Sequence, residues 1–142
     1  MKKRILGVVI ALIGLGILIQ LVPLSGRGNN PAVVAEPAWD SSQTRTLAKR
    51  ACFDCHSNET VWPWYSYVAP VSWLVYSDTM QGRQRLNFSQ WTSITQRRTG
   101  EIAEVIRGGE MPPAIYLPMH PSAQLTAAEK QQLITGLTIS LK

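Results

Sequence analysis

The longest hydrophobic run of the chain lies close to its amino-terminal end. Residues 5–24, ILGVVIALIGLGILIQLVPL, contain no charged side chain. A helix of this length, at about 1.5 Å per residue, matches a hydrocarbon core of about 30 Å. Cations occupy positions 2–4, and only Arg27 follows the run closely. The pattern predicts a single transmembrane helix, with its amino terminus in the cytoplasm and the rest of the chain outside.

A cleaved signal peptide is the competing interpretation of this run. The apolar stretch of a signal peptide is usually about 7 to 15 residues long and is closely followed by a cleavage site. Here the candidate site, with cleavage after Ala35, lies well downstream. We therefore predict a membrane anchor over residues 1–25, a linker rich in Gly, Asn and Pro over 26–38, and a folded domain over 39–142.

Four segments of the folded domain show the apolar spacing of helices, and none alternates as a strand would. They are residues 42–51, a segment from Pro70 that ends before Gly82, residues 89–107 ended by Gly108-Gly109, and a last helix capped by Thr126 with Glu129. The sequence thus predicts an all-α domain with long connections rich in Pro and Trp. Its expected core positions are Leu47, Ile102, Val105, Ile106, Leu133 and Leu137.

Charge and length exclude several classes of function. The chain has 14 Lys and Arg against 9 Asp and Glu, and three of the cations belong to the amino-terminal signal before the hydrophobic run. No basic cluster interleaved with aromatic residues is found in the remainder, so nucleic-acid binding is not expected. A chain of 142 residues provides one modest domain and excludes a large enzyme.

Residues 52–56 read Cys-Phe-Asp-Cys-His, the C-x-x-C-H pattern of covalent c-type haem attachment. On a helical turn, two thiols three residues apart can each reach a vinyl group on one edge of a porphyrin. The adjacent His56 can then bring an imidazole nitrogen to the iron. The pattern predicts one covalently attached haem c, held by Cys52, Cys55 and His56. Such haem is attached outside the bacterial cytoplasmic membrane, where the predicted anchor places the domain.

Three other interpretations of this motif remain open. Redox-active thiols of the thioredoxin type need a βαβ context, which the pattern does not predict. A zinc site would need Cys52, Cys55, His56 and His120 together, including two adjacent residues on one ion. A disulfide between Cys52 and Cys55 is permitted outside the cytoplasm, but it leaves His56 without a role.

The motif belongs to an ordered set of stretches: CFDCHSNET, WPWYS, AP-x-SW, GRQRLNFSQW, GGEMPP and LPMHP. The set runs from about Ala51 to Leu141 and resembles the small bacterial haem-binding domain proteins related to cytochrome c. The resemblance implies an α-helical cytochrome c-like fold, covalent haem and a location in the cell envelope.

The sixth iron ligand is expected from the carboxyl-terminal part of the chain. The G-x-MPP element at 109–113 is similar to the methionine loop of cytochromes c, which makes Met111 the expected ligand. His120 is the alternative, and Met119 beside it is a further candidate on the same proline-bounded stretch. Met80 lies on a predicted helix, where methionine usually fills a core.

Other residues are candidates for the haem surroundings. The second ring nitrogen of a proximal histidine normally donates to a carbonyl or carboxylate, and Pro63 or Pro70 offers one unless these prolines only shape their loop. Arg83 and Arg85 either pair with haem propionates or are solvated, and Asp54 is expected to face solvent. Haem walls and ordinary core are expected to share the aromatic residues Trp62, Trp64, Tyr65, Tyr67, Trp73 and Trp91.

Two classes of function fit these features. The first is an electron carrier rather than an enzyme, on the periplasmic side of the bacterial inner membrane, with a transient redox protein partner. The alternative is a haem-based sensor or a peroxidase-type protein for small ligands, which needs a displaceable sixth ligand. Optical spectra with and without carbon monoxide separate the two.

Overall fold

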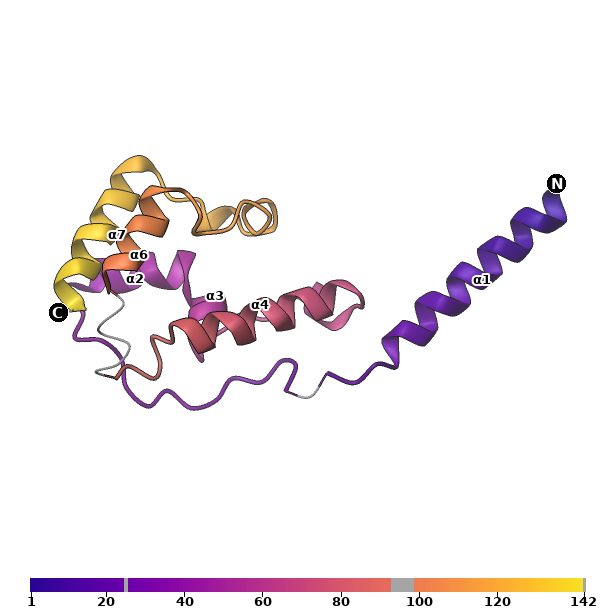
Figure 1. Cartoon of the computed structure of the whole chain (residues 1–142), viewed down its shortest axis with the longest axis horizontal. Helices are drawn as coiled ribbons and strands as arrows, with labels where there is room; N and C mark the ends of the chain where they lie inside the picture. Colours follow the sequence, from indigo (N-terminus) through magenta and orange to yellow (C-terminus); the bar gives the residue numbers. More distant parts are fainter. Residues whose placement is uncertain (25, 93–98, 142) are drawn as a thin grey trace. The chain divides into compact units, whose positions relative to one another are not determined.

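The computed structural model describes residues 1–24, 26–92 and 99–141, and the regular secondary structure of these residues is helical, with no strand among them (Figure 1). One isolated parallel bridge joins Ala35 and Gln90. The all-α prediction is therefore confirmed. The helices are α1 (Lys2–Gln20), α2 (Ser42–Ala51), α3 (Phe53–His56), α4 (Val71–Arg85), α6 (Thr99–Arg107) and α7 (Ala127–Ser140), with 3-10 turns η1 (Trp64–Tyr67), η2 (Leu117–Met119) and η3 (Pro121–Ala123).

The chain forms two compact units. Unit 1 comprises residues 1–29 and 62–78, and unit 2 comprises residues 30–61 and 79–142, so that α4 begins in one unit and ends in the other. Part of the predicted linker belongs to unit 2. Its Ala32 carbonyl accepts a 2.8 Å hydrogen bond from Asn58 Nδ2, and Ala35 N donates to the Ser89 carbonyl at 3.2 Å.

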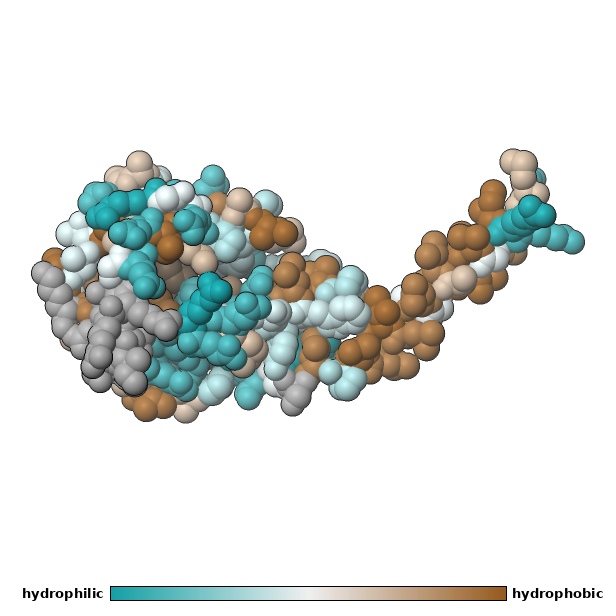
Figure 2. Space-filling model, viewed as in Figure 1, coloured by the Kyte–Doolittle hydropathy of each residue, from teal (hydrophilic) through white to brown (hydrophobic). Residues whose placement is uncertain are grey.

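In unit 1, α1 is the helix that the amino-terminal run predicts. It has no buried residue, and Figure 2 shows hydrophobic side chains along most of its length. By length and composition it can cross a membrane, although a signal sequence shares these features. The helix ends at Gln20, before the uncharged run ends, because Pro23 disfavours helical backbone at the residue before it.

In unit 2, the hydrophobic core lies among α2, α6 and α7. Of the predicted core residues, Leu47, Ile106, Leu133 and Leu137 are buried, and Ile102 is half-buried against them. Val105 is also half-buried. The other buried members of this core are Ala48, Ala51, Phe53, Phe88, Leu125, Ile134 and Leu141.

Helix α7 crosses α2 at close range. A Cβ atom on Gly136 would lie 2.0 Å from Thr44 Oγ1, so only glycine fits at this point of α7. Because the two helices touch here, the position of α2 is fixed against α7. The residues that follow α2, from Cys52 onward, therefore begin at a defined place in unit 2.

The predicted boundaries of α2 and the predicted start of α7 agree with the structure. α2 covers the predicted range, and α7 begins with the predicted capping box, in which Thr126 Oγ1 accepts from Glu129 N and Glu129 Oε2 accepts from Thr126 N. Two boundaries differ. α4 continues past Gly82, where the sequence predicted its end, to Arg85, because Gly82 packs against Cys55. Of the third predicted helix, residues 89–92 are not helical, residues 93–98 lie outside the described ones, and α6 begins at Thr99.

Candidate functional site

The two cysteines and the histidine of the motif occupy one short turn. α2 ends at Ala51, and the Cys52 carbonyl then accepts from the backbone N–H of Cys55 at 3.2 Å and of His56 at 2.9 Å. The sulfurs of Cys52 and Cys55 are not joined by a disulfide bond. Burial, with a smaller contribution from the Cys55 sulfur, raises the pKa of the Cys52 thiol to about 12. Cys52 is therefore an uncharged thiol at neutral pH.

The His56 imidazole is held by the carboxyl-terminal end of α4. Its Nδ1 lies 3.1 Å from the carbonyl oxygen of Gly82 and 3.1 Å from that of Leu86. Carbonyl oxygens only accept hydrogen bonds, so Nδ1 carries the proton and Nε2 keeps the lone pair. Burial lowers the pKa of His56 despite the two carbonyl contacts, which raise it. The ring is thus the neutral tautomer that coordinates a metal through Nε2.

Gly82 explains both the length of α4 and the position of these carbonyls. A Cβ atom at residue 82 would lie 2.3 Å from the Cys55 carbonyl oxygen and 3.0 Å from its Cβ. The absence of a side chain lets the backbone of α4 pack directly against α3, so glycine serves here as a contact surface and does not end the helix. The Gly82 carbonyl, which also accepts from Leu86 N at 2.9 Å, and the Leu86 carbonyl directly after α4 are thereby brought within reach of His56 Nδ1.

The acceptors of His56 differ from those that the sequence offered. The Pro63 carbonyl accepts from Ser66 N at 3.0 Å, and the Pro70 carbonyl accepts from Trp73 N at 3.0 Å. Both prolines therefore shape their own turns. The two real acceptors lie 26 and 30 residues after His56, which the local sequence does not reveal.

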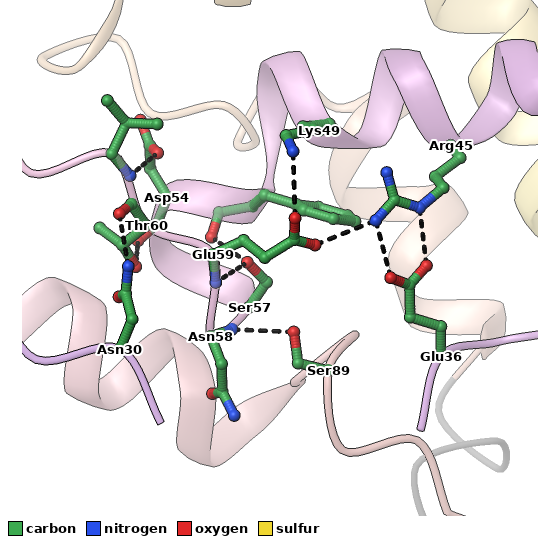
Figure 3. Close-up of polar contacts among 12 residues, drawn as sticks. Asn30, Glu36, Arg45, Lys49, Asp54, Ser57, Asn58, Glu59, Thr60 and Ser89 are labelled. Atoms are coloured by element: carbon green, nitrogen blue, oxygen red, sulfur yellow. Dashed lines mark hydrogen bonds and ion pairs between the residues drawn. The ribbon is translucent and has the colours of Figure 1, made fainter. Parts of the chain in front are cut away.

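The segment that follows His56 is anchored by buried polar side chains (Figure 3). Ser57 Oγ donates to the Phe53 carbonyl at 2.8 Å and accepts from Glu59 N at 2.9 Å. Asn58 N donates to Ser89 Oγ at 2.9 Å, and the His56 carbonyl accepts from Phe88 N at 2.8 Å. These bonds clamp the chain on the carboxyl side of the motif. The sequence gives one sign of them, the polar run of residues 57–60 directly after His56.

Arg83 belongs to this anchoring network. Its Nε donates to the Ser57 carbonyl at 2.8 Å, and its Nη2 donates to Thr60 Oγ1 and Asn30 Oδ1, both at 2.9 Å. Burial lowers the pKa of Arg83. Its guanidinium is committed to the loop behind the motif, so solvated surface charge is not its role. Arg85, the other predicted arginine, is exposed.

Asp54 connects the motif to the loop that carries the predicted sixth ligands. Its Oδ1 accepts from Val61 N at 2.9 Å, and its Oδ2 accepts from the Tyr116 hydroxyl at 2.6 Å. The Tyr116 ring stacks on His120, with 3.7 Å between centroids and 8° between planes. Asp54 is thus a structural anchor, which corrects the expectation that it faces solvent.

Met111 and His120 occupy different positions on this loop. Gly109, with φ of +75°, ends α6, and the backbone N–H groups of Glu110 and Met111 both point to the Val105 carbonyl. Met111 is half-buried. His120 Nδ1 donates to the Tyr116 carbonyl at 3.0 Å. Of the weaker candidates, Met119 is 58% exposed and Met80 is half-buried.

The described residues offer no zinc site. Within residues 1–24, 26–92 and 99–141, no group of three or more His, Cys, Asp and Glu side chains is placed to hold a metal ion. The donor set at the motif, an imidazole with a fixed tautomer and two thiols on one turn, suits a haem that brings its own iron.

The aromatic residues fall into two groups. Trp39, Phe53, Phe88 and Trp91 pack together in unit 2, with centroids 5.5 to 6.2 Å apart along the chain of contacts. Of those predicted to form haem walls or core, only Trp91 is in this group. Trp64 and Tyr67 lie in unit 1 with most or half of their surface exposed, so neither is a core residue.

Comparison with known proteins gives one match. The sequence model of a protein family described as a haem-binding domain matches residues 14–138, most of the chain. Searches of curated proteins and of solved structures find no match.

Proposed function

This chain belongs to the haem-binding domain family, and on that premise we propose that it is a membrane-anchored c-type cytochrome. Cys52 and Cys55 hold one haem covalently, and His56 is its proximal ligand. The family makes the chain a haem protein. The type of haem, its attachment and its ligands are what the proposal adds.

The observation that carries the proposal is the setting of the His56 ring. Two backbone carbonyls fix its Nδ1 proton and its orientation, so the lone pair of Nε2 has one direction. An oriented, neutral imidazole is what a proximal haem ligand requires, and the two thiols on the same turn suit covalent attachment.

Cys52 and Cys55 supply the covalent attachment. Each thiol would hold one vinyl group of the haem through a thioether bond, which the addition of S–H across the vinyl double bond would form without an oxidant or a leaving group. The haem iron, when bound, supplies a one-electron redox centre.

Met111 is our choice for the sixth ligand, with His120 as the alternative. Support for Met111 comes from its place after the Gly109 turn, where backbone bonds to Val105 hold the residue, and from the half-burial of its side chain. The stacking of His120 on Tyr116 gives that ring a partner within its own loop.

We place the haem-binding unit on the outer side of the bacterial inner membrane, held there by α1. The cations at positions 2–4 and the apolar helix that follows support this orientation. A small tethered haem protein fits electron transfer to a redox protein that docks transiently.

Extraction with acid acetone tests covalent attachment. The full-length protein, expressed with a c-type maturation system, should retain its haem and show the mass of the chain plus one haem. Cys52→Ala with Cys55→Ala should lose all haem on extraction. Each single variant should retain one attachment and is the matched control. Complete loss of haem from the wild-type protein would show that the attachment is not covalent.

Optical spectra test the sixth ligand. Methionine–iron coordination gives a weak far-red band in the ferric protein, which should disappear in Met111→Ala and persist in His120→Ala. A high-spin iron in His120→Ala, with no change in Met111→Ala, would assign the ligand to His120. Ready binding of carbon monoxide by the wild-type protein would favour a sensor or small-ligand protein over an electron carrier.

A further inference from the structure

Unit 1 contains a second uncharged stretch in addition to α1. Residues 62–77 of this unit contain no charged side chain and hold six of the eleven aromatic residues of the chain, and all six are Trp or Tyr. These two residue types are enriched at membrane–water interfaces, which accept both an apolar ring and its polar N–H or O–H. The composition of this stretch therefore suits the headgroup region of a bilayer.

Part of this stretch is exposed apolar surface. Trp64 is 72% exposed, Tyr67 50% and Val68 43%, all at η1 or directly after it. On the first turn of α4, Val71 and Leu74 are 46% and 49% exposed and share a face, because they are three residues apart. We call these five residues the 64–74 surface. Exposed apolar side chains this close together in the chain favour a contact with another phase or molecule.

Hydrogen bonds tie this part of unit 1 to the end of α1. The Gln20 side chain donates from Nε2 to the Ala69 carbonyl at 3.1 Å and accepts at Oε1 from Ala69 N at 2.9 Å. Ala69 lies between η1 and α4 and is buried. Gln20 is the last residue of α1, so this pair of hydrogen bonds fixes the 64–74 surface at the carboxyl end of that helix.

The same end of α1 is held from a second direction. The Arg27 guanidinium lies 5.8 Å from the centre of the Tyr67 ring, a cation–π distance. A Cβ atom on Gly28 would lie 2.9 Å from the Tyr67 hydroxyl, so the chain after α1 runs directly along this ring. Arg27, the first charge after the hydrophobic run, therefore sits at the edge of the 64–74 surface.

We propose that the 64–74 surface inserts into the interface of the membrane leaflet from which α1 emerges. The inference rests on the proposed anchoring by α1 and names a second lipid contact beyond that helix. The occupant is lipid because the surface is fixed to the carboxyl end of α1, the point at which a membrane-spanning helix reaches the headgroups. No charge within residues 62–77 has to be desolvated. Arg27 lies where a cation meets lipid phosphates.

Photo-crosslinking of the full-length holoprotein tests this contact. Photoreactive p-benzoylphenylalanine is introduced at Ile17 in α1, at Trp64, or at the exposed Gln132 of α7, and each protein is irradiated in vesicles of phosphatidylethanolamine and phosphatidylglycerol. Mass spectrometry then separates lipid adducts from protein adducts. We expect lipid adducts at positions 17 and 64, several-fold above those at position 132.

The three positions distinguish the possible failures. Lipid adducts at position 17 with none at position 64 would overturn the proposed contact and leave the anchor intact. No lipid adduct at position 17 would overturn the anchor and the contact together. A protein adduct at position 64 in place of a lipid adduct would identify a protein interface and overturn the lipid contact.

A second set of variants tests whether the aromatic side chains cause the insertion. With p-benzoylphenylalanine at Val71, Trp64→Ser combined with Tyr67→Ser should reduce lipid adducts at position 71 several-fold. Adducts at position 17 in the same background should remain, and the haem content should be unchanged, which shows that the variant has folded. Unchanged adducts at position 71 would contradict the role of these two rings.

Discussion

In unit 2, His56 lies on a four-residue helix that α4 and the segment around Ser89 hold in place. Met111 and His120 lie on a loop in which many of the hydrogen bonds join residues close together in the chain. His56 has two carbonyl acceptors, and its own carbonyl accepts from Phe88. On the loop, Met111 is bonded to Val105 and His120 to Tyr116. The bond from Tyr116 to Asp54 connects this loop to the motif.

The two regions differ in which contacts hold the candidate iron ligand in position. The ring of His56 is set by backbone atoms far along the chain, so its geometry depends on how α3 and α4 pack. The loop from residue 110 to residue 120 is set by local turns and one strong side-chain bond. We expect changes at the α3–α4 contact to affect the whole unit, and changes on the loop to affect chiefly the sixth ligand.

Gly82→Ala should produce the largest effect. The new Cβ atom would meet the Cys55 carbonyl oxygen at 2.3 Å, so α4 must move away from α3 and the bonds to His56 must lengthen. Overpacking of this kind costs about 1 to 3 kcal/mol. We expect a lower midpoint of unfolding by urea and a lower yield of haem-loaded protein.

Gly100→Ala is the matched control for this prediction. A Cβ atom at residue 100, on α6, would meet no atom within 4 Å. Alanine is the better helix former by about 1 kcal/mol, so this variant should be as stable as the wild type or more stable. Equal stability of Gly82→Ala and Gly100→Ala would show that the α3–α4 contact does not determine the position of His56.

Tyr116→Phe should have a smaller and more local effect. It removes the hydroxyl that donates to Asp54 at 2.6 Å while keeping the ring that stacks on His120. A hydrogen bond to a charged group contributes about 1.5 to 3 kcal/mol, and part of that is regained from water because Tyr116 is half-buried. We expect faster binding of carbon monoxide, measured by stopped flow, with haem attachment unchanged.

Tyr67→Phe removes the same atom from an exposed ring of unit 1 and is the control. Its carbon monoxide kinetics should match those of the wild type. If Tyr116→Phe behaves in the same way as Tyr67→Phe, the bond to Asp54 does not hold the loop near the ligand position.

The sequence predicted the parts of this unit that depend on short-range patterns. The C-x-x-C-H spacing, the α2 range, the Thr126 capping box and the apolar positions of α7 each involve residues within a few turns of one another. Such patterns can be interpreted without knowledge of the tertiary structure.

The parts that the sequence did not predict depend on contacts across many residues. Gly82 looks like a helix end, because its packing partner, Cys55, lies 27 positions earlier and no local pattern connects them. Arg83 looks like surface charge or a propionate partner, because the carbonyl of Ser57 carries no sequence signal. Asp54 looks like a solvent-facing residue between two cysteines for the same reason.

The smallest expected effect on stability concerns Arg45 of α2, which forms ion pairs with two glutamates. Its Nε and Nη2 each lie 2.7 Å from an oxygen of Glu36, and Nη2 lies 3.0 Å from Glu59 Oε2 (Figure 3). The Arg45 guanidinium holds the pKa of Glu36 below its ordinary value of 4.5, against the opposing effect of burial. A bidentate pair that is about one-third exposed on the arginine side contributes on the order of 1 kcal/mol or less.

Glu36→Gln should therefore lower the free energy of unfolding at pH 7 by up to about 1 kcal/mol, measured with urea on the haem-loaded protein. The sign of the pH dependence follows from the lowered pKa. The carboxylate stabilises the folded state above its unfolded pKa near 4.5, and this contribution is lost as the pH falls through the folded-state pKa. The difference between the wild type and Glu36→Gln should accordingly shrink below pH 4.5. The exposed Glu104→Gln on α6 is the control. If the difference in free energy of unfolding between the wild type and Glu36→Gln stays constant from neutral to acid pH, the ion pair with Arg45 does not contribute to the stability of the folded protein.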